Sequence, residues 1–545
     1  MPNAMPDSNS TPLSADVVII GAGAAGGAAA VKLLRKGLSV LMLEAGAPLD
    51  QGMLVSNYRN GAYKNNHMAP YPMMPWAPHP NFVPHDNGYL IQKGPAPYTA
   101  QYIRGVGGTT WHWAGQAWRL IPNDFRMQSL YGQSVDWPIS YDELEPYYCE
   151  AEVEMGVSGG GALAGDYGSP RSMPYPMDVL PLPYAFERLR QRYQSVGLEL
   201  LPGPQARNST AYDDRPACCG NNNCMPICPI GAQYNGSMSV RRAQGLGLDL
   251  ISNAVVFKLE TGEGNRIVAA HFIDQNKEVH RVTGKHFLLT ANAMESVKIL
   301  LMSKDERNPN GVANATDQVG RRLMDHPASA VEYLADEPLY VGRGPMCPGS
   351  INNTRDGAFR SERSALRIDV HNDNPTRYLT EKYVAQGYYG NELNEKIKRD
   401  AERFVLLKSM FEMLPDPENR IVLSDQKDAW GIPKMEVHYR FPEYVHRGYD
   451  VCREHFADCV KASGGTEVKF SERGQYTNSQ HITGTLSMGS DPHTSVCNKL
   501  AQAHDHENLY FGGTGVMPTA ALVNSTLTGV ALSLLAADSI IKASV

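Results

Sequence analysis

The clearest pattern of apolar and polar positions lies at residues 15–46. A short apolar run, "VVII", precedes a segment rich in small residues, "AAGGAAAVKLLRKG", and a second apolar run, "SVLMLE", ends in an acid. Short apolar runs bounded by turn residues are typical of buried strands, and the middle segment has the composition of a helix that ends at Gly37. The stretch therefore predicts one βαβ unit.

Later segments add both helices and paired strands. The patterns predict a helix over 142–156, a hairpin over 249–274 around Gly262–Gly264, a strand and a helix over 286–303, and strands over 418–425 and 434–441. Residues 60–100 are dense in Pro, His and aromatic residues, which indicates a long ordered loop. We expect its His67, His79 and His85 to be hydrogen-bonded loop residues rather than metal ligands. The mixture predicts an α/β nucleotide-binding fold with an inserted, mainly antiparallel sheet domain.

The chain length predicts more than one domain, because 545 residues exceed what a single hydrophobic core usually serves. A short disordered tail is expected at residues 1–14. We expect the nucleotide-binding domain over 15–135, 215–330 and 480–545, and the substrate-binding domain over 136–214 and 331–479.

Composition narrows the classes of function. The net charge of -7 gives no basic face for a phosphate backbone, so no nucleic-acid partner is expected. The first fifteen residues lack Lys, Arg and any apolar run, which argues against a secretion signal there. Residues 520–537 approach the length of a membrane span, but Asn524 and several hydroxyl side chains favour a buried helix. The chain itself is expected to be soluble.

The hexapeptide "GAGAAG" supplies three glycines with separate roles in binding a dinucleotide. Gly21 permits the tight turn, Gly23 lets the backbone approach a pyrophosphate, and Gly26 lets the helix pack on the strand. Glu44 stands at the end of the next strand, where a ribose hydroxyl needs an acceptor. The C-terminal residues 509–540 return as a strand, a turn and a small-residue helix, which favours FAD over NAD.

These stretches resemble the glucose–methanol–choline (GMC) family of flavoprotein oxidoreductases from end to end. The resemblance is carried by "GAGAAG…LEAG", "VGGTTWHWAG" (106–115), "ANAMESVKILLMS" (291–303), "VGRRLMDHP" (319–327) and "HITGTLSMG…MPTAALVNSTLT" (481–528). It implies a Rossmann-like FAD-binding domain with an inserted antiparallel-sheet substrate domain. The implied FAD-binding residues are Gly21, Gly23, Gly26, Glu44, Gly107, Gly108, Thr109, Thr110, His112, Val256, Asn292 and Gly515.

The same resemblance indicates the catalytic residues. His481 stands where the family has its catalytic base, and Asn524 stands where the family has His or Asn. An amide cannot act as a base at neutral pH, so Asn524 is expected to hydrogen-bond the substrate oxygen and orient His481. His112 matches a position that carries a covalent flavin link in pyranose oxidases. It is expected either to form such a link or to pack beside the flavin ring.

Four of the nine cysteines lie in "CCGNNNCMPIC", as Cys218, Cys219, Cys224 and Cys228. The ending C-x3-C-P resembles the last step of a bacterial ferredoxin motif, which favours an iron–sulfur cluster. A zinc site, structural disulfides or free thiols are the alternatives. Adjacent side chains point in different directions, so Cys218, Cys224 and Cys228 are favoured as ligands and Cys219 as the spare. The resemblance also implies a 3Fe-4S cluster.

The cysteine cluster, "WHW" and "YDELEPYY" resemble the large subunits of bacterial membrane-bound sugar dehydrogenases. The resemblance implies oxidation of glucose, fructose, sorbitol, gluconate or 2-ketogluconate, with electrons leaving through the cluster. The implied partners are a small subunit with the export signal and a membrane-bound cytochrome c subunit, at the periplasmic face of the inner membrane. An oxidase that reduces oxygen, or a non-catalytic relay subunit, are the alternatives. Arg343, Arg367 and Arg440 are candidates for holding a sugar acid, although such arginines more often lie on the surface.

Overall fold

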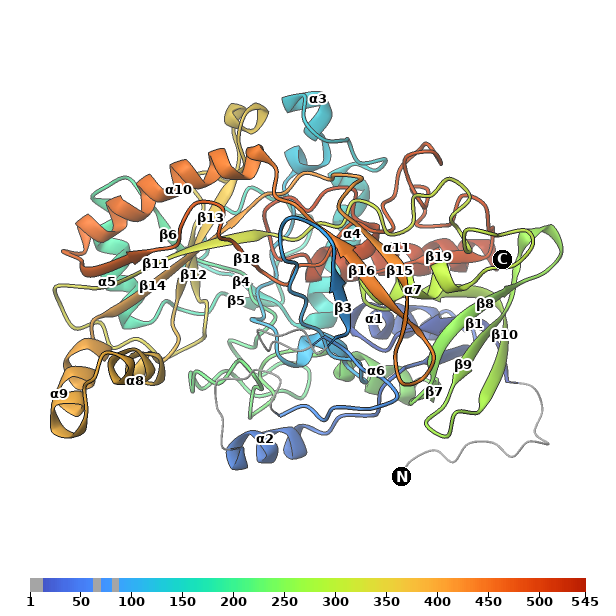
Figure 1. Cartoon of the computed structure of the whole chain (residues 1–545), viewed down its shortest axis with the longest axis horizontal. Coiled ribbons are helices and arrows are strands. Elements are labelled where there is room, and N and C mark those ends of the chain that lie inside the picture. The colour runs from blue at the N-terminus through green and yellow to red at the C-terminus, as the bar shows by residue number, and fades with distance from the viewer. Residues whose placement is uncertain (1–12, 62–69, 81–87) are drawn as a thin grey trace.

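Two large sheets lie at opposite ends of the long axis of the molecule, with a small sheet between them (Figure 1). The structure is a computed structural model that describes residues 13–61, 70–80 and 88–545. The predictions for residues 1–12, His67 and His85 therefore lie outside the described residues. Ser14, which the sequence assigned to the tail, already begins β1.

The first sheet contains the predicted βαβ unit. Its strands run in the order β7, β2, β1, β10, β9, β8, and β19 also pairs with β10. β1 is parallel to both β2 and β10, while β8 and β9 form the predicted antiparallel hairpin. The strands are β1 (Ser14–Ile20), β2 (Val40–Leu43), β7 (Asp249–Ile251), β8 (Val255–Thr261), β9 (Ile267–Ile273), β10 (Val279–Leu289) and β19 (Leu509–Phe511).

Helices from distant parts of the chain pack together beside this sheet. α1 (Ala24–Arg35) contacts α6 (Gly236–Gly245) and α11 (Thr526–Ala543), and α11 also contacts α4 (Tyr141–Met155). α11 is the one helix in the described part of the chain that is long and apolar enough to cross a membrane. Because 67% of its apolar window is buried inside the protein, it serves here as the buried core helix that the sequence predicts.

The second sheet is antiparallel, as the sequence predicts for an inserted domain. Its order is β17, β11, β14, β13, β12, β6, and β18 pairs with β11. α5 (Tyr184–Gln194) and α10 (Glu443–Ala462) pack against it, and α8 (Thr376–Ala385) and α9 (Gly390–Ala401) lie at the far end (Figure 1). The strands are β6 (Leu200–Pro202), β11 (Pro327–Leu334), β12 (Gly349–Ile351), β13 (Leu366–His371), β14 (Phe404–Phe411), β17 (Thr466–Phe470) and β18 (Thr477–Asn478).

A three-stranded sheet joins the two halves. The predicted strands near 418–425 and 434–441 are β15 (Arg420–Lys427) and β16 (Pro433–His438), and β3 (Leu90–Gln92) pairs with β16 in parallel. β3 lies within the segment predicted to be loop, in a stretch without proline, and it is an edge strand. The remaining elements are α2 (Gln51–Asn60), α3 (Met127–Tyr131), β4 (Ser158–Gly160), β5 (Met177–Asp178) and α7 (Ala293–Met302).

The core that surrounds the first sheet draws on both predicted domains. It includes residues of α4, and Ile421 and Val437 from the small sheet, although the predicted division places all of these with the second sheet. A separate core lies between the second sheet and α5 and α10. The division of the chain into two domains stays a prediction.

Candidate active site

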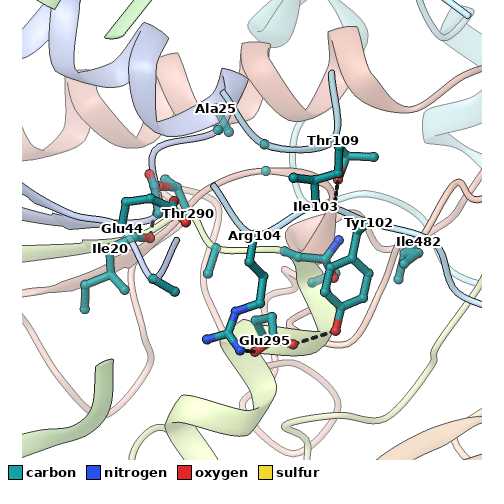
Figure 2. Close-up of a pocket in the computed structure, with 18 of the residues that line it drawn as sticks. Ile20, Ala25, Glu44, Tyr102, Ile103, Arg104, Thr109, Thr290, Glu295 and Ile482 are labelled. Carbon is teal, nitrogen blue, oxygen red and sulfur yellow. Dashed lines mark hydrogen bonds and ion pairs between the residues drawn. The ribbon is translucent and has the colours of Figure 1, made fainter. Parts of the chain in front are cut away.

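A long groove runs along the carboxyl ends of β1 and β2, where the glycine-rich turn enters α1 (Figure 2). We call it the FAD groove. Eight of the predicted FAD-binding residues line it, namely Gly21, Gly23, Glu44, Gly108, Thr109, Thr110, Val256 and Asn292. The structure places Gly26, Gly107, His112 and Gly515 outside this set of lining residues.

The three glycines of the turn differ in what surrounds them. A Cβ on Gly26 would lie 2.1 Å from the carbonyl oxygen of Gly21, so the close approach of α1 to the turn requires glycine there. Gly21 itself has φ +110° and faces the backbone of Ala291. A Cβ on Gly23 would meet nothing within 4 Å, because this position faces the groove. The three positions thus differ in backbone conformation and in open space, and their separate roles in binding a dinucleotide stay a prediction.

We expect Gly23→Val to yield a folded protein without FAD. The new side chain enters space that is open in the protein but is needed by the cofactor, and the extended backbone at this position accepts it. Gly26→Ala is the comparison variant, and it should fail to fold because of the collision with Gly21. Flavin absorbance and circular dichroism of the purified variants measure both effects. Native flavin content in Gly23→Val would contradict this assignment.

Backbone amides hold Glu44 at the edge of the groove. Its Oε2 accepts a hydrogen bond from the Ala22 amide (2.9 Å), and its Oε1 accepts one from the Gly46 amide (3.0 Å). Burial raises the pKa of this carboxyl group. The carboxylate is therefore fixed in orientation, with lone pairs left for a ribose hydroxyl.

A buried charged group that sequence reasoning missed lies at the middle of the groove (Figure 2). Tyr102 donates its hydroxyl hydrogen to Glu295 Oε1 (2.5 Å), and Arg104 lies 3.8 Å from Glu295 Oε2. Burial would raise the pKa of Glu295, but Arg104 and Lys298 outweigh it and keep the pKa below its ordinary value. The i, i+3 spacing of Glu295 and Lys298 within one motif was the signal that could have identified part of this group.

The groove carries unpartnered polar atoms that suit a polar cofactor. Gln101 Nε2 and Gln480 Oε1 are buried, line the groove and have no hydrogen-bond partner in the described structure. Buried polar atoms are nearly always paired in native proteins, so these two atoms fit a site that a bound group completes. Together with the open face of Gly23, they show that the groove residues fit FAD.

His112 is not among the residues that line this groove. Its ring is buried and stands beside the ring of Tyr71, with ring centroids 5.6 Å apart. Its amide donates to the carbonyl of Thr109 (3.1 Å), a residue that does line the groove. The covalent flavin link at His112 stays a prediction, which the retention of yellow colour after acid denaturation would test.

The structure brings His481 and Asn524 into contact, as the sequence predicts for a pair. Asn524 Nδ2 lies 2.9 Å from His481 Nε2, and on the other side His326 Nδ1 lies 2.8 Å from His481 Nδ1. His326 Nε2 lies 3.0 Å from the carbonyl oxygen of Ala521. Arg367 donates from Nη2 to Asn524 Oδ1 (2.8 Å). These contacts form one chain of hydrogen bonds.

The groups at the two ends of this series of hydrogen bonds determine which atom donates in every bond between them. A carbonyl can only accept, so His326 Nε2 carries the hydrogen, and neutral His326 must accept at Nδ1. Burial lowers the pKa of His326 to about 4, which keeps it neutral. His481 therefore donates from Nδ1. Its Nε2 is left with a lone pair, in agreement with the amide hydrogen that Asn524 presents there.

Burial also keeps the His481 imidazole in its neutral, unprotonated form. Burial, followed by His326 and Arg367, lowers the pKa of His481 well below 6.5. The imidazole is therefore neutral at physiological pH, with a lone pair at Nε2 that can accept a proton.

Arg367 was noted in the sequence as one of three candidate arginines, and only this one lies at the site. It is fully buried and donates from Nη2 to Gln116 Oε1 (2.7 Å) and Asp369 Oδ2 (3.0 Å) as well as to Asn524. Its Nε and Nη1 and the Oδ1 of Asp369 have no partner in the described structure. Arg343 is exposed, and Arg440 pairs with Asp416 at the surface.

Asp325 connects the two histidines through the backbone. Its Oδ1 accepts from the amides of His326 (2.7 Å) and His481 (2.9 Å), and Tyr98 donates to Oδ2 (3.2 Å). The residue is fully buried, and burial raises the pKa of its carboxyl group from 3.8 to about 7. Asp325 thus holds both histidines in register while it titrates close to neutral pH.

We expect the stability of the Asp325→Asn variant, relative to that of the native protein, to increase as the pH rises. The folded state binds the Asp325 proton more tightly than the unfolded chain does, so this contribution to stability is complete below about pH 4 and is lost as pH rises toward about 7. The difference in Tm between the variant and the native protein should therefore grow in favour of the variant between about pH 4 and about pH 7 and should level off above that. The exposed Asp491→Asn serves as the control. An unchanged difference would contradict the prediction.

The four clustered cysteines lie in a segment called here the cysteine loop, residues 218–228. Burial raises the pKa of Cys218, and the neighbouring Cys224 and Cys228 thiols add to this effect, so these three groups lie within electrostatic reach. Cys219 is exposed. The choice of Cys218, Cys224 and Cys228 as ligands and Cys219 as the spare stays a prediction.

The sulfur positions do not suit a single zinc ion. Tetrahedral zinc would hold its sulfur ligands about 3.8 Å apart, given Zn–S bonds near 2.3 Å. Within the described ranges, the one group of three or more potential ligand atoms within 4.8 Å is Asp274, Glu278 and His280, at a surface turn. In the described structure no three of the clustered cysteine sulfurs lie within 4.8 Å of one another, and thiolates are the ligands that hold iron–sulfur clusters. The iron–sulfur cluster stays a prediction.

Comparison with known proteins agrees with this geometry. Residues 16–57 match the FAD binding domain family, and residues 415–533 match the GMC oxidoreductase family. The chain is 48% identical to the fructose dehydrogenase large subunit of Gluconobacter japonicus, over 98% of this chain and 99% of the relative. It is 28% identical to paromamine 6'-oxidase of Streptomyces fradiae, over 94% and 88% of the two chains.

Solved structures give the same result for the fold. Formate oxidase superposes with a TM-score of 0.69 at 13% identity, over 98% of this chain and 99% of the other. The predicted fold class, the predicted family and FAD as the cofactor are thereby confirmed. The chain belongs to the GMC oxidoreductase family and is an FAD-dependent oxidoreductase that acts on CH–OH groups.

Proposed function

We propose that the chain is the catalytic subunit of a sugar dehydrogenase, with fructose as the first substrate to test. The observation that carries this proposal is the 48% identity to a fructose dehydrogenase large subunit along nearly the whole chain. The hydrogen-bond chain around His481 supports it, since oxidation of an alcohol needs a base for the hydroxyl proton. FAD, when bound, supplies the acceptor for the carbinol hydride.

The proposed roles of the residues follow from the direction of their hydrogen bonds. His481 takes the hydroxyl proton at Nε2, and Asn524 donates to the substrate oxygen from the amide that now contacts His481. His326 holds the His481 ring in the tautomer that leaves Nε2 free of hydrogen. Arg367 fixes the orientation of Asn524, and its unpartnered Nε and Nη1 bind a further oxygen of the sugar.

The proposed route for electrons leads through an iron–sulfur cluster, of the 3Fe-4S type, bound by Cys218, Cys224 and Cys228. Ile227 of the cysteine loop packs with Trp111 and Ile103, and Ile103 lines the FAD groove. This packing supports a short path from the flavin site to the cluster. A cluster passes single electrons, which favours a protein acceptor over oxygen.

The proposed partners and location rest on the resemblance to membrane-bound dehydrogenases. A large subunit implies at least one smaller one, and the relative carries that designation. We assign a small subunit with the export signal and a membrane-bound cytochrome c subunit, with the complex at the periplasmic face of the inner membrane.

The deciding experiment is an anaerobic titration of the purified chain with fructose, sorbitol, glucose, gluconate and 2-ketogluconate. Fructose is expected to bleach the flavin absorbance, with a cluster signal in low-temperature EPR of the same sample. Bleaching by a different compound would correct the substrate. Peroxide formation in air without a cluster signal would favour an oxidase, and no bleaching by any compound would favour a relay subunit.

A further inference from the structure

The strand that reaches the active site also reaches the cysteine loop. β13 carries Arg367 and Asp369, and it continues directly into Asn372. Asn372 is fully buried, and its side chain accepts from the Gly342 amide (3.0 Å) and donates to the Pro345 carbonyl (2.8 Å). Asn372 therefore fixes the segment 342–346 against the end of β13.

The cysteine loop is bonded to the same segment. Asn222 donates from Nδ2 to the carbonyl oxygens of Asn372 (2.8 Å) and Gly344 (3.0 Å). The amide of Gly344 in turn donates to the carbonyl of Gly220 (2.9 Å). The first half of the loop is thus attached to the second sheet through three hydrogen bonds.

Packing extends this attachment to a predicted iron ligand. Cys224 is buried in a small cluster with Met346 and Cys347, of which Met346 ends the segment that Asn372 fixes and Cys347 follows it. The amide of Asn372 also donates to the carbonyl of Met346 (2.8 Å). The position of the Cys224 thiol therefore depends on β13.

The second half of the loop is held from the opposite side. Tyr71 donates to the carbonyl of Pro226, and Gln51 of α2 donates to the carbonyl of Cys228 (2.9 Å). The loop is therefore bonded to Gln51 and Tyr71 through its second half and to the end of β13 through its first half.

We infer that Asn222 and Asn372 are positioning residues of the metal centre. They fix the Cys218–Cys224 half of the cysteine loop to the strand that holds the active-site arginine. The inference rests on the iron–sulfur cluster of the proposed function. The surroundings of metal ligands determine their orientation and tune the electronic properties of the centre, so the loss of this attachment should change the cluster and leave sugar oxidation intact.

Asn222→Gly is the sharpest variant. Asn222 has φ +60°, a left-handed conformation that glycine adopts without strain, so the change removes the amide and keeps the backbone. Asn223→Gly is the matched control, since Asn223 is an exposed neighbour whose side chain makes no hydrogen bond to β13 or to residues 342–346 in the described structure. We expect Asn222→Gly to retain iron about 10-fold less tightly and to show a shifted cluster EPR signal.

Asn222→Gly and Asn223→Gly should both show native rates of flavin bleaching by the substrate in anaerobic stopped-flow. Asn372→Ala is a second variant that should reproduce the EPR change of Asn222→Gly. An EPR signal and iron retention in Asn222→Gly equal to those of Asn223→Gly would overturn the inference. If the native chain itself shows no cluster signal, the cluster of the proposed function fails first, so the two failures are distinguishable.

Discussion

Replacing His481 by Gln is expected to lower the rate constant of flavin reduction by about 10²- to 10⁴-fold. The glutamine side chain still hydrogen-bonds to its neighbours but cannot take a proton from the substrate. Anaerobic stopped-flow with the substrate found in the titration measures the effect, and the bound FAD should be unchanged. His493→Gln, at an exposed position in the same region, is the control. A rate within about threefold of the native one would remove His481 as the base.

The pH profile of the native enzyme reports the protonation state of His481, the proposed base. Because the pKa of His481 lies well below 6.5, the imidazole stays neutral throughout the neutral range. The kcat/KM value should therefore not decrease through protonation of His481 as the pH falls toward 6.5. The Asp325→Asn variant separates any effect of that nearby carboxyl group, which titrates at about 7.

Cys224→Ala is expected to abolish the EPR signal of the proposed cluster while the flavin is still bleached by the sugar. Cys224 is the most deeply buried of the four clustered cysteines, and alanine would leave one iron of the proposed cluster without its thiolate. Electron delivery to a cytochrome acceptor should fall with the signal. Cys219→Ala is the matched control and should keep the signal. Loss of the signal in the Cys219 variant would show that the assignment of Cys219 as the cysteine that does not bind iron is wrong.

The parts of the fold that sequence predicts best are those with local patterns. The βαβ unit, the β8–β9 hairpin and the strands β15 and β16 each have an apolar period or a turn signal within a few residues. The assembly of the first core is different, because α4 packs on α11, although residues 156–525 separate the two helices in the sequence. No local pattern indicates which helices meet at such a distance.

In the active site, too, some residues can be identified from the sequence and others cannot. His481 and Asn524 are identifiable through the family motifs, and the structure places them 2.9 Å apart. Arg367 looks like an ordinary charged residue in a strand, because two of its partners, Gln116 and Asn524, lie on segments far from β13 in the sequence. The role of Asn372 is equally hidden in the sequence, since its partners are backbone groups of a loop that has no regular pattern.

The placement of α11 has a consequence for biosynthesis. The groove needs Gly529 and Val530 from this helix, and the site needs Asn524 just before it. A chain emerging from the ribosome therefore exposes the β1–α1 turn long before its covering helix has been made. FAD can be enclosed only after α11 has been made, so the supply of free flavin from that moment on should determine the yield of active protein.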